Sequence, residues 1–354
     1  MKKFFITTLI AIALFSCRKE NNNPEIIIPD VGLIVLNEGF WGMNNASITY
    51  YSFETKTAHQ NVFFNLNDRL LGDTPNDILI YGGKIYISVG GSSTLVITDL
   101  EFNFIKQISF DGETINARQP HGLASHNGKI FIACFDGKLA RLDTSTLEID
   151  RIISVGKNPE NIAISNGFAY VTNSGGLDGI LNPQNFDSTV SVVNLATFTE
   201  VKKIVVGKNP FSIGVDERGD IIVGCRGDYG FTFPFSLHRI NTSDHSVYTF
   251  QNVEPSDFVI HKSTIYFYNV TFTPDWDVER IEYIAYNTAT GTKTNLLVNS
   301  NLIQMPYAIN VNRENENIYI SCSMTQRVFA FDKNGVKLFD FEAGEMPKKI
   351  VVLR

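Results

Sequence analysis

The sequence is poor in charged residues, and acidic residues outnumber basic ones. Only 19% of the 354 residues are charged, whereas 44% are hydrophobic. That balance excludes an intrinsically disordered chain, a collagen or a coiled coil, and it supplies ample material for a core. The formal net charge of −7 argues against a surface that binds phosphates. We therefore expect a globular protein that does not bind nucleic acid.

Cysteine is too scarce for a disulfide framework or a zinc cluster. Of the four cysteines, Cys17 belongs to the leader described below, and Cys134, Cys225 and Cys322 each end a short apolar run. An odd number of thiols cannot all pair, and none of these has the close spacing of zinc ligands. We predict three buried, unpaired thiols and no resident metal.

Common catalytic motifs are also missing. The chain contains neither G-x-S-x-G nor H-E-x-x-H, and the pair Gly175-Gly176 lacks the strand-to-helix context of a phosphate-binding loop. We therefore predict no catalytic residues and no catalytic cofactor, and we interpret the protein as a binding protein rather than an enzyme.

The first 16 residues have the pattern of a lipoprotein signal peptide. Lys2 and Lys3 precede an apolar run over residues 4–15, which is too short to cross a membrane comfortably. The segment 14–17 (LFSC) matches a bacterial lipobox, so Cys17 is the predicted site of lipidation, and residues 17–30 form a tether. An ordinary secretory signal is the alternative. No later stretch reaches membrane-spanning length.

Internal repeats predict an all-β fold, a seven-bladed β-propeller with four antiparallel strands in each blade. Residues 158–207 contain four short runs with period-two alternation, separated by turn residues. A proline followed by an apolar run recurs every 39–51 residues, which is the spacing of propeller blades. Each proline should begin the innermost strand of a blade. The seven are Pro75, Pro120, Pro159, Pro210, Pro255, Pro306 and Pro347.

The two ends of the body are expected to close the ring. Residues 347–353 resemble an inner strand with no strands after it, whereas residues 32–64 hold three strands that lack an inner one. If the C-terminal strand completes the N-terminal blade, the ring has no open sheet edges. Residues 31–354 would then form a single propeller domain.

Long insertions fall on the connections that a propeller places on one face. These connections join the second strand of a blade to the third, or one blade to the next, and they contain both tryptophans. Loops of this length in a compact domain are usually functional. The insertions are residues 37–45, 65–74, 111–119, 173–189, 226–234 and 269–280.

We expect the ligand site on this face. Solvated aromatic side chains suit a large, flat, partly apolar ligand or a protein partner, although some of them could instead anchor the loops. Residues that follow the blade prolines should point toward the axis, where His121 would act as a hydrogen-bonding group, a base or a ligand. The candidate ligand-binding residues are Phe40, Trp41, Asn76, Arg118, His121, Arg226, Tyr229, Phe231, Trp276 and Tyr307.

Two resemblances make these expectations more specific. Residues 158–214 resemble the YncE-type and surface-layer-type seven-bladed propellers. Residues 37–40 (NEGF), 45–51 (NASITYY) and 71–73 (LGD) resemble the lipid-anchored propellers that accompany TonB-dependent outer-membrane transporters, among them the BtuG-type cobalamin-binding lipoproteins. This resemblance implies a lipid-anchored protein of the outer membrane, at the cell surface. It would bind a corrinoid (a vitamin B12-like ligand) and pass it to a TonB-dependent transporter.

Other functions fit the same sequence. Haem, a glycan or a peptide could occupy an aromatic face, and the propeller could be a protein-interaction scaffold without a small ligand. A metal-dependent, lactonase-like hydrolase is a further alternative, in which Asp187 and Asn173 would meet a calcium ion.

Overall fold

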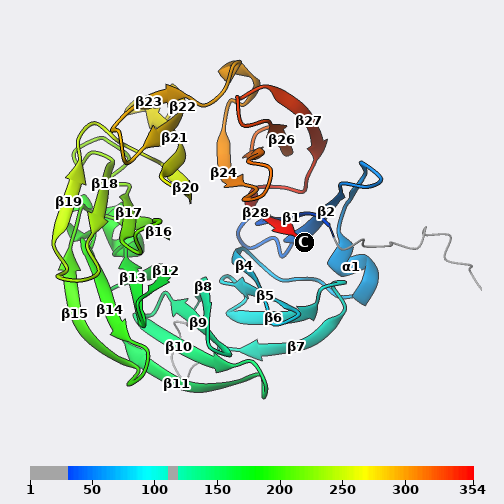
Figure 1. The fold of residues 1–354 in the computed structure, drawn as a ribbon. Coiled ribbons are helices and arrows are strands. Elements are labelled where there is room, and N and C mark those ends of the chain that lie inside the picture. The colour runs from blue at the N-terminus through cyan, green and yellow to red at the C-terminus, as the bar shows by residue number, and fades with distance from the viewer. Residues whose placement is uncertain (1–30, 111–118) are drawn as a thin grey trace, which may run out of the picture.

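The computed structural model describes residues 31–110 and 119–354, and these form a ring of seven sheets around a central axis (Figure 1). Each sheet has four antiparallel strands, so the predicted propeller is confirmed. The proposed signal peptide and tether, the lipidation site Cys17 and the candidate residue Arg118 lie outside the described residues.

We number the blades in chain order and give their strands from the axis outward. Blade 1 contains β28 (Pro347–Leu353), β1 (Gly32–Asn37), β2 (Ser47–Ser52) and β3 (Ala58–His59). Blades 2 to 4 contain β4 (Pro75–Tyr81), β5 (Lys84–Val89), β6 (Thr94–Asp99) and β7 (Phe104–Ser109); β8 (Pro120–His126), β9 (Lys129–Cys134), β10 (Lys138–Asp143) and β11 (Glu148–Ser154); and β12 (Pro159–Ser165), β13 (Phe168–Asn173), β14 (Thr189–Asn194) and β15 (Thr199–Val205). Blades 5 to 7 contain β16 (Pro210–Val215), β17 (Ile221–Cys225), β18 (Ser236–Ile240) and β19 (Val247–Phe250); β20 (Asp257–His261), β21 (Thr264–Phe272), β22 (Val278–Asn287) and β23 (Lys293–Asn295); and β24 (Pro306–Val311), β25 (Ile318–Cys322), β26 (Arg327–Phe331) and β27 (Lys337–Glu342).

The ring closes as the sequence predicts. Strand β28 pairs antiparallel with β1, from Gly32 opposite Leu353 to Asn37 opposite Pro347. In Figure 1 the red arrow of β28 lies beside the blue strands of blade 1. Every blade therefore has an inner strand, and no inner sheet edge is left open at the junction of the two ends.

The hydrophobic core lies between neighbouring blades. The second strand of each blade is covered on both faces, so strands such as β17 are buried along their whole length and their sequences are nearly all apolar. Outer strands alternate, as β7 does, between half-buried and exposed side chains. Cys134, Cys225 and Cys322 end second strands, and all three are buried and form no disulfide within the described residues.

Several segments differ from the sequence-based expectation. The inner strand of blade 6 begins at Asp257 rather than at Pro255. The expected insertion 269–280 is mostly sheet, because β21 extends to Phe272 and β22 starts at Val278, which leaves a turn of residues 273–277. Tertiary pairing of the two alternating flanks overrides the loop-like composition of this segment.

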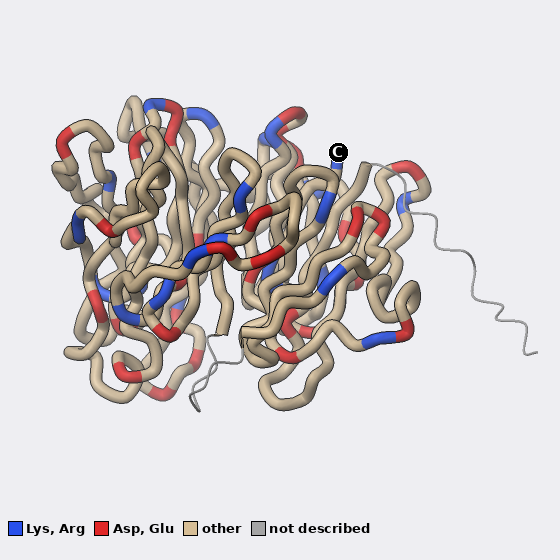
Figure 2. Tube along the Cα trace, turned by 90° about the horizontal axis from the view of Figure 1, so that it is seen from below, with Lys and Arg blue, Asp and Glu red and all other residues tan. Residues whose placement is uncertain are grey.

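Short helices also occur, although only strands and loops were expected from the sequence. They are α1 (Val62–Asn67), α2 (Gly176–Leu181), η1 (Pro183–Asn185) and η2 (Ser300–Leu302). In the part of the chain that the structure describes, no helix has the length and apolar character needed to cross a membrane. Seen from the side in Figure 2, basic and acidic residues are interspersed around the ring.

Candidate functional site

The long connections surround a cavity at one end of the axis, which we call the mouth cavity. Its volume is about 850 Å³, within the range of roughly 300–1,000 Å³ that is typical of small-molecule sites. It is lined by connections of the face predicted from the sequence and by the first residues of inner strands. Five predicted residues line it: Phe40, Trp41, Asn76, His121 and Tyr229.

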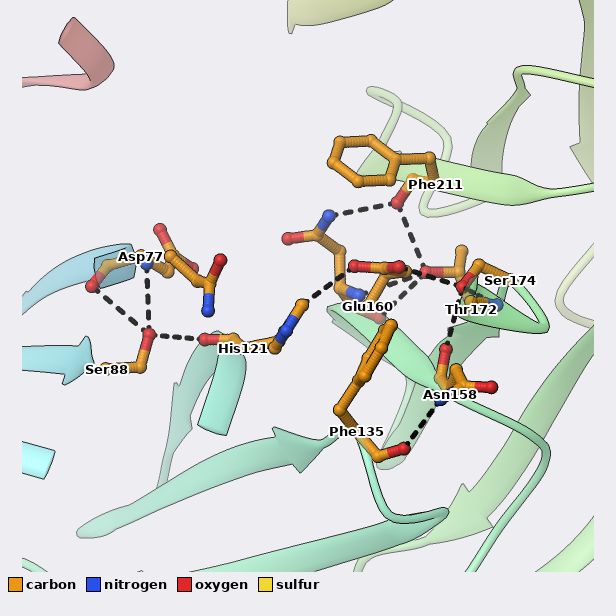
Figure 3. A network of polar contacts seen from close by, with 12 residues as sticks. Asp77, Ser88, His121, Phe135, Asn158, Glu160, Thr172, Ser174 and Phe211 are labelled. Atoms are coloured by element: carbon orange, nitrogen blue, oxygen red, sulfur yellow. Dashed lines mark hydrogen bonds and ion pairs between the residues drawn. The ribbon is translucent and has the colours of Figure 1, made fainter. Parts of the chain in front are cut away.

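A histidine–glutamate pair forms part of the floor of the mouth cavity (Figure 3). His121 and Glu160 are the second residues of β8 and β12, so each directly follows a blade proline and points toward the axis. The Nδ1 atom of His121 lies 2.9 Å from Oε2 of Glu160. Because a carboxylate only accepts hydrogen bonds, Nδ1 must carry a proton in this contact, so in the neutral form of the imidazole the lone pair is on Nε2.

Two further contacts hold this pair. The Ser174 hydroxyl donates a hydrogen bond of 2.8 Å to Oε1 of Glu160. The ring of Phe135 stacks on the imidazole of His121, with 4.4 Å between centroids and an interplanar angle of 6°. Ser174 and Phe135 directly follow second strands, so the same position of two adjacent blades supports the pair.

The carboxyl of Glu160 is only 9% exposed, but its environment favours the ionised form. Burial alone would raise its pKa. The charge that His121 carries when it is protonated, the hydrogen bonds from His121 and Ser174, and the charge of Arg226 more than offset this effect, and the pKa of Glu160 lies below its ordinary value. Glu160 is therefore a fixed negative charge beside the imidazole rather than a general base.

A second polar network links the blades on the other side of the floor. Glu38 accepts hydrogen bonds from the phenol of Tyr307 and, at 2.6 Å, from Nζ of Lys348. Lys348 also donates to Oδ1 of Asn76 at 2.8 Å, and the amide of Asn76 donates to the carbonyl of Pro120 at 3.2 Å. Burial, reinforced by the charge and hydrogen bond of Glu38, raises the pKa of Tyr307. The phenol is therefore a neutral donor.

Below the mouth cavity, the axis contains a second cavity of about 390 Å³. The predicted residues Tyr307 and Arg226 line this axial cavity rather than the mouth cavity, and Asn76 lines both. The guanidinium of Arg226 stacks on Phe211, with 3.4 Å from Cζ to the ring centroid, and Nε donates to the carbonyl of Ser256 at 3.1 Å. Arg226 thus supports the floor from beneath.

The remaining predicted aromatic residues form a cluster beside the mouth. Trp276 packs against Tyr229, Phe231 and Phe272, with centroid separations of 5.7, 5.2 and 5.8 Å. Tyr229 lines the mouth cavity, whereas Phe231 and Trp276 lie outside its lining as the structure describes it. The two expected roles of these aromatics, platform and loop anchor, therefore coexist in one cluster.

Sequence reasoning missed the apolar side of the cavity. Leu177 and Ile180 of α2 line it, and they are 68% and 58% exposed. Leu181, one residue further on, is 85% exposed. The spacing of these three residues is that of one face of a helix, which was the available signal. Phe135 and Ser174 gave no signal, because each contacts the inner strand of its own blade only once the sheet has formed.

The expected alternative of a calcium site finds no support among the described residues. Asp187 accepts hydrogen bonds from the amide of Ser188 and the hydroxyl of Thr189, and the amide of Asn173 donates to the same hydroxyl. In the ranges 31–110 and 119–354, no group of three or more His, Cys, Asp or Glu side chains could hold a metal ion.

Solved structures share the fold at low sequence identity. Hydrazine synthase from Kuenenia stuttgartiensis superposes with a TM-score of 0.64 and 14% identity, over 79% of this chain and 95% of that one. A catalytically inactive virginiamycin B lyase from Staphylococcus aureus, with quinupristin, gives a TM-score of 0.58 and 12% identity, over 82% and 92%. The computationally designed Ika8 protein gives 0.56 and 10%, over 90% and 89%.

Identities of this size establish the fold and nothing finer. A search of curated proteins finds no match to this sequence. A family model does match: it covers residues 31–353, the whole propeller, and its description is "Domain of unknown function (DUF5074)". The chain therefore belongs to the DUF5074 family.

Proposed function

We propose that this protein captures a large, flat, partly apolar molecule of the corrinoid type in the mouth cavity. The observation that carries the proposal is the combination of an exposed apolar rim with a buried polar floor. On the rim, Trp41 is 70% exposed and Leu177 is 68% exposed. Exposed apolar side chains around a cavity commonly mark a binding site, because their contact with water is costly.

The chemistry of a corrinoid complements both parts of the cavity. A corrin ring has apolar faces, which suit aromatic and aliphatic contacts with Phe40, Trp41 and Ile180. The edge of the corrin ring carries amides, which both donate and accept hydrogen bonds. These amides therefore suit groups such as Asn76 and Lys348 on the floor of the cavity. The floor also positions the ligand, since its polar groups are held by hydrogen bonds between different blades.

The proposal includes the cellular setting. The lipobox at residues 14–17 supports lipidation of Cys17, which would hold the propeller at the outer membrane and facing outward. The exposed apolar rim that faces the ligand would then also meet a TonB-dependent transporter, which takes the ligand over. Fatty-acid labelling that disappears in Cys17→Ala tests the anchor, and labelling that persists rules it out.

Binding can be tested directly with the protein expressed from residue 18. The ring closes on itself within residues 32–353, so the leader is not needed for the fold. We expect cyanocobalamin to co-elute with the protein on gel filtration and to quench tryptophan emission, because Trp41 lines the cavity. Trp41→Ala and Tyr229→Ala should each weaken binding by roughly 1–3 kcal/mol.

Lys84→Ala is the matched control, because Lys84 begins β5 at the opposite end of the blades. Its affinity should equal that of the unaltered protein. If cyanocobalamin, cobinamide and hemin all fail to bind, the ligand proposal is wrong. If the control weakens binding as much as Trp41→Ala does, the site lies on the other face of the ring.

A further inference from the structure

We propose that His121 is an axial ligand: its Nε2 atom coordinates the central metal of a tetrapyrrole bound in the mouth cavity. This inference rests on the proposed function and specifies its chemistry. It requires a ligand with a metal ion and an exchangeable axial position, which a corrinoid or a haem offers and a glycan or peptide does not.

The first argument is the orientation of the imidazole. Three contacts fix it: Nδ1 is bonded to Glu160, the ring face lies against Phe135, and the backbone carbonyl of His121 accepts a hydrogen bond of 2.5 Å from the hydroxyl of Ser88. Figure 3 shows these contacts reaching the histidine from different blades. A ring held in this way loses little entropy when Nε2 binds a metal.

The second argument is the state of the free nitrogen. Nε2 of His121 has no hydrogen-bond partner among residues 31–110 and 119–354, and it is not one of the buried polar atoms that lack a partner there. The side chain is 17% exposed and lines the mouth cavity. The lone pair of Nε2 is therefore accessible from the cavity.

A second histidine of the same protein shows what a structural histidine looks like. His238 uses both nitrogens within the fold: Nε2 lies 3.1 Å from the amide of Gly207 and 2.9 Å from the hydroxyl of Ser236, and Nδ1 lies 3.0 Å from the hydroxyl of Thr249. His121 uses one nitrogen and leaves the other at a cavity. That asymmetry is typical of a ligating histidine.

The third argument is donor strength. Histidine ligands of metals commonly donate their other N–H group to a carboxylate, which fixes the tautomer and makes the free nitrogen a better donor. Glu160 supplies that carboxylate, and the hydroxyl of Ser174 holds it in place. Both oxygens of this carboxylate are thus engaged, one by the imidazole of His121 and the other by the hydroxyl of Ser174.

The coordination step balances without any oxidant or reductant. A metal(III) tetrapyrrole with an axial water exchanges that water for the neutral imidazole: one metal–oxygen bond breaks, one metal–nitrogen bond forms, and the water leaves. No proton or electron moves. A tightly held axial cyanide would not be displaced, so cyanocobalamin should bind by its faces and amides alone.

The visible spectrum of the ligand provides the test. Aquocobalamin, cyanocobalamin and hemin are each added to the protein expressed from residue 18, to His121→Ala and to Glu160→Gln. We expect aquocobalamin bound to the unaltered protein to show the band shift that follows exchange of axial water for nitrogen. His121→Ala should abolish the shift and lose roughly tenfold more affinity for aquocobalamin than for cyanocobalamin. Glu160→Gln should retain a smaller shift with weaker binding.

The matched control is His126→Ala, because His126 ends strand β8, of which His121 is the second residue. It should keep both the shift and the affinity. Aquocobalamin and hemin that bind with the spectra of the free ligands overturn the axial role but leave the proposed capture function intact. A band shift with hemin alone supports the axial role of His121 and indicates that the ligand is a haem rather than a corrinoid. If none of the three ligands binds, the proposed capture function is wrong, and the axial role of His121 is wrong with it.

Discussion

At the scale of single residues, an unusual backbone conformation orients the side chains that form the floor of the mouth cavity. Five inner strands are preceded by a residue with positive φ. Its carbonyl accepts a hydrogen bond from the residue after the second strand, as Gln119 does from Phe135 and Asn158 does from Ser174. L-residues other than Asn rarely adopt this conformation. The five are Thr74, Gln119, Asn158, Asn209 and Met346.

This contact explains why His121 and Glu160 meet. The contact fixes the chain just before five of the blade prolines, so that the residue after each of these prolines points toward the axis. Asn158 suits the conformation, whereas Thr74 and Gln119 bear strain of the order of 1–2 kcal/mol each. Backbone strain that recurs at the edge of a cavity is compatible with a functional site, where the correct placement of side chains can outweigh a loss of stability.

His238 makes stability depend on pH. Burial lowers its pKa from 6.5 to about 4 in the folded protein, so between these pH values the unfolded chain binds a proton that the folded chain does not. Stability therefore falls on acidification from pH 6.5 to about 4, by on the order of 2–3 kcal/mol. Thermal melting across this range should show a decline that His238→Gln reduces.

The control for this experiment is Ser321→Ala. It removes the hydroxyl that donates to the carbonyl of Pro347 at 2.6 Å, so it should lower the melting temperature by a different mechanism. The slope of its melting temperature against pH should stay that of the unaltered protein. An unchanged slope in His238→Gln would show that another group is responsible for the acid sensitivity.

At the scale of elements, α2 acts as a wall of the mouth cavity. It presents Leu177 and Ile180 to the cavity, and it packs on the buried ring of Phe186 through Gly179. A Cβ atom at position 179 would lie 2.0 Å from Cδ1 of Phe186, which real structures do not tolerate. The absence of a side chain at Gly179 therefore sets how close α2 lies to the blade.

Gly179→Ala separates two opposing effects. Helix propensity alone favours alanine by about 1 kcal/mol, but the clash with Phe186 must lift α2 and displace Ile180. We expect ligand affinity to fall several-fold, and the melting temperature to change little because α2 lies outside the sheets. Tryptophan quenching by cyanocobalamin and thermal melting measure the two effects. Leu181→Ala is the control, because Leu181 is on the same helix but lies outside the cavity lining that the structure describes. Equal affinities in the two variants would contradict this role of α2.

At the scale of the whole molecule, the repeats predicted the ring but not the cavity. Blade prolines and period-two runs are local features, and they were sufficient to place six of the seven inner strands, the closing strand β28 among them. In blade 6 the amide of Ser256 donates to the carbonyl of Tyr268, and the inner strand begins only at Asp257.

The site depends on contacts between repeats, which no single repeat encodes. His121 and Glu160 were expected near the axis, yet their pairing depends on the angle between two blades. Phe135 and α2 enter through connections whose conformation is set by what they pack against. Arg226 and Tyr307 were predicted on the ligand face, and the structure places them one layer deeper, in the axial cavity.

Ring closure gives the last prediction. Deleting residues 346–354 removes β28, which exposes the edge of β1, takes the buried side chains of Ile350 and Leu353 out of the core, and removes the contact of Lys348 with Glu38. We expect aggregation or a melting temperature lower by many degrees. The milder Ile350→Ala keeps the ring and should cost about 2–5 kcal/mol, because Ile350 is only 1% exposed. Arg354→Ala, at the exposed end of the chain, should melt like the parent. A truncated protein that stays monomeric with the parental melting temperature would mean that β28 does not hold the ring together, because an open ring with two free sheet edges cannot match the stability of a closed one.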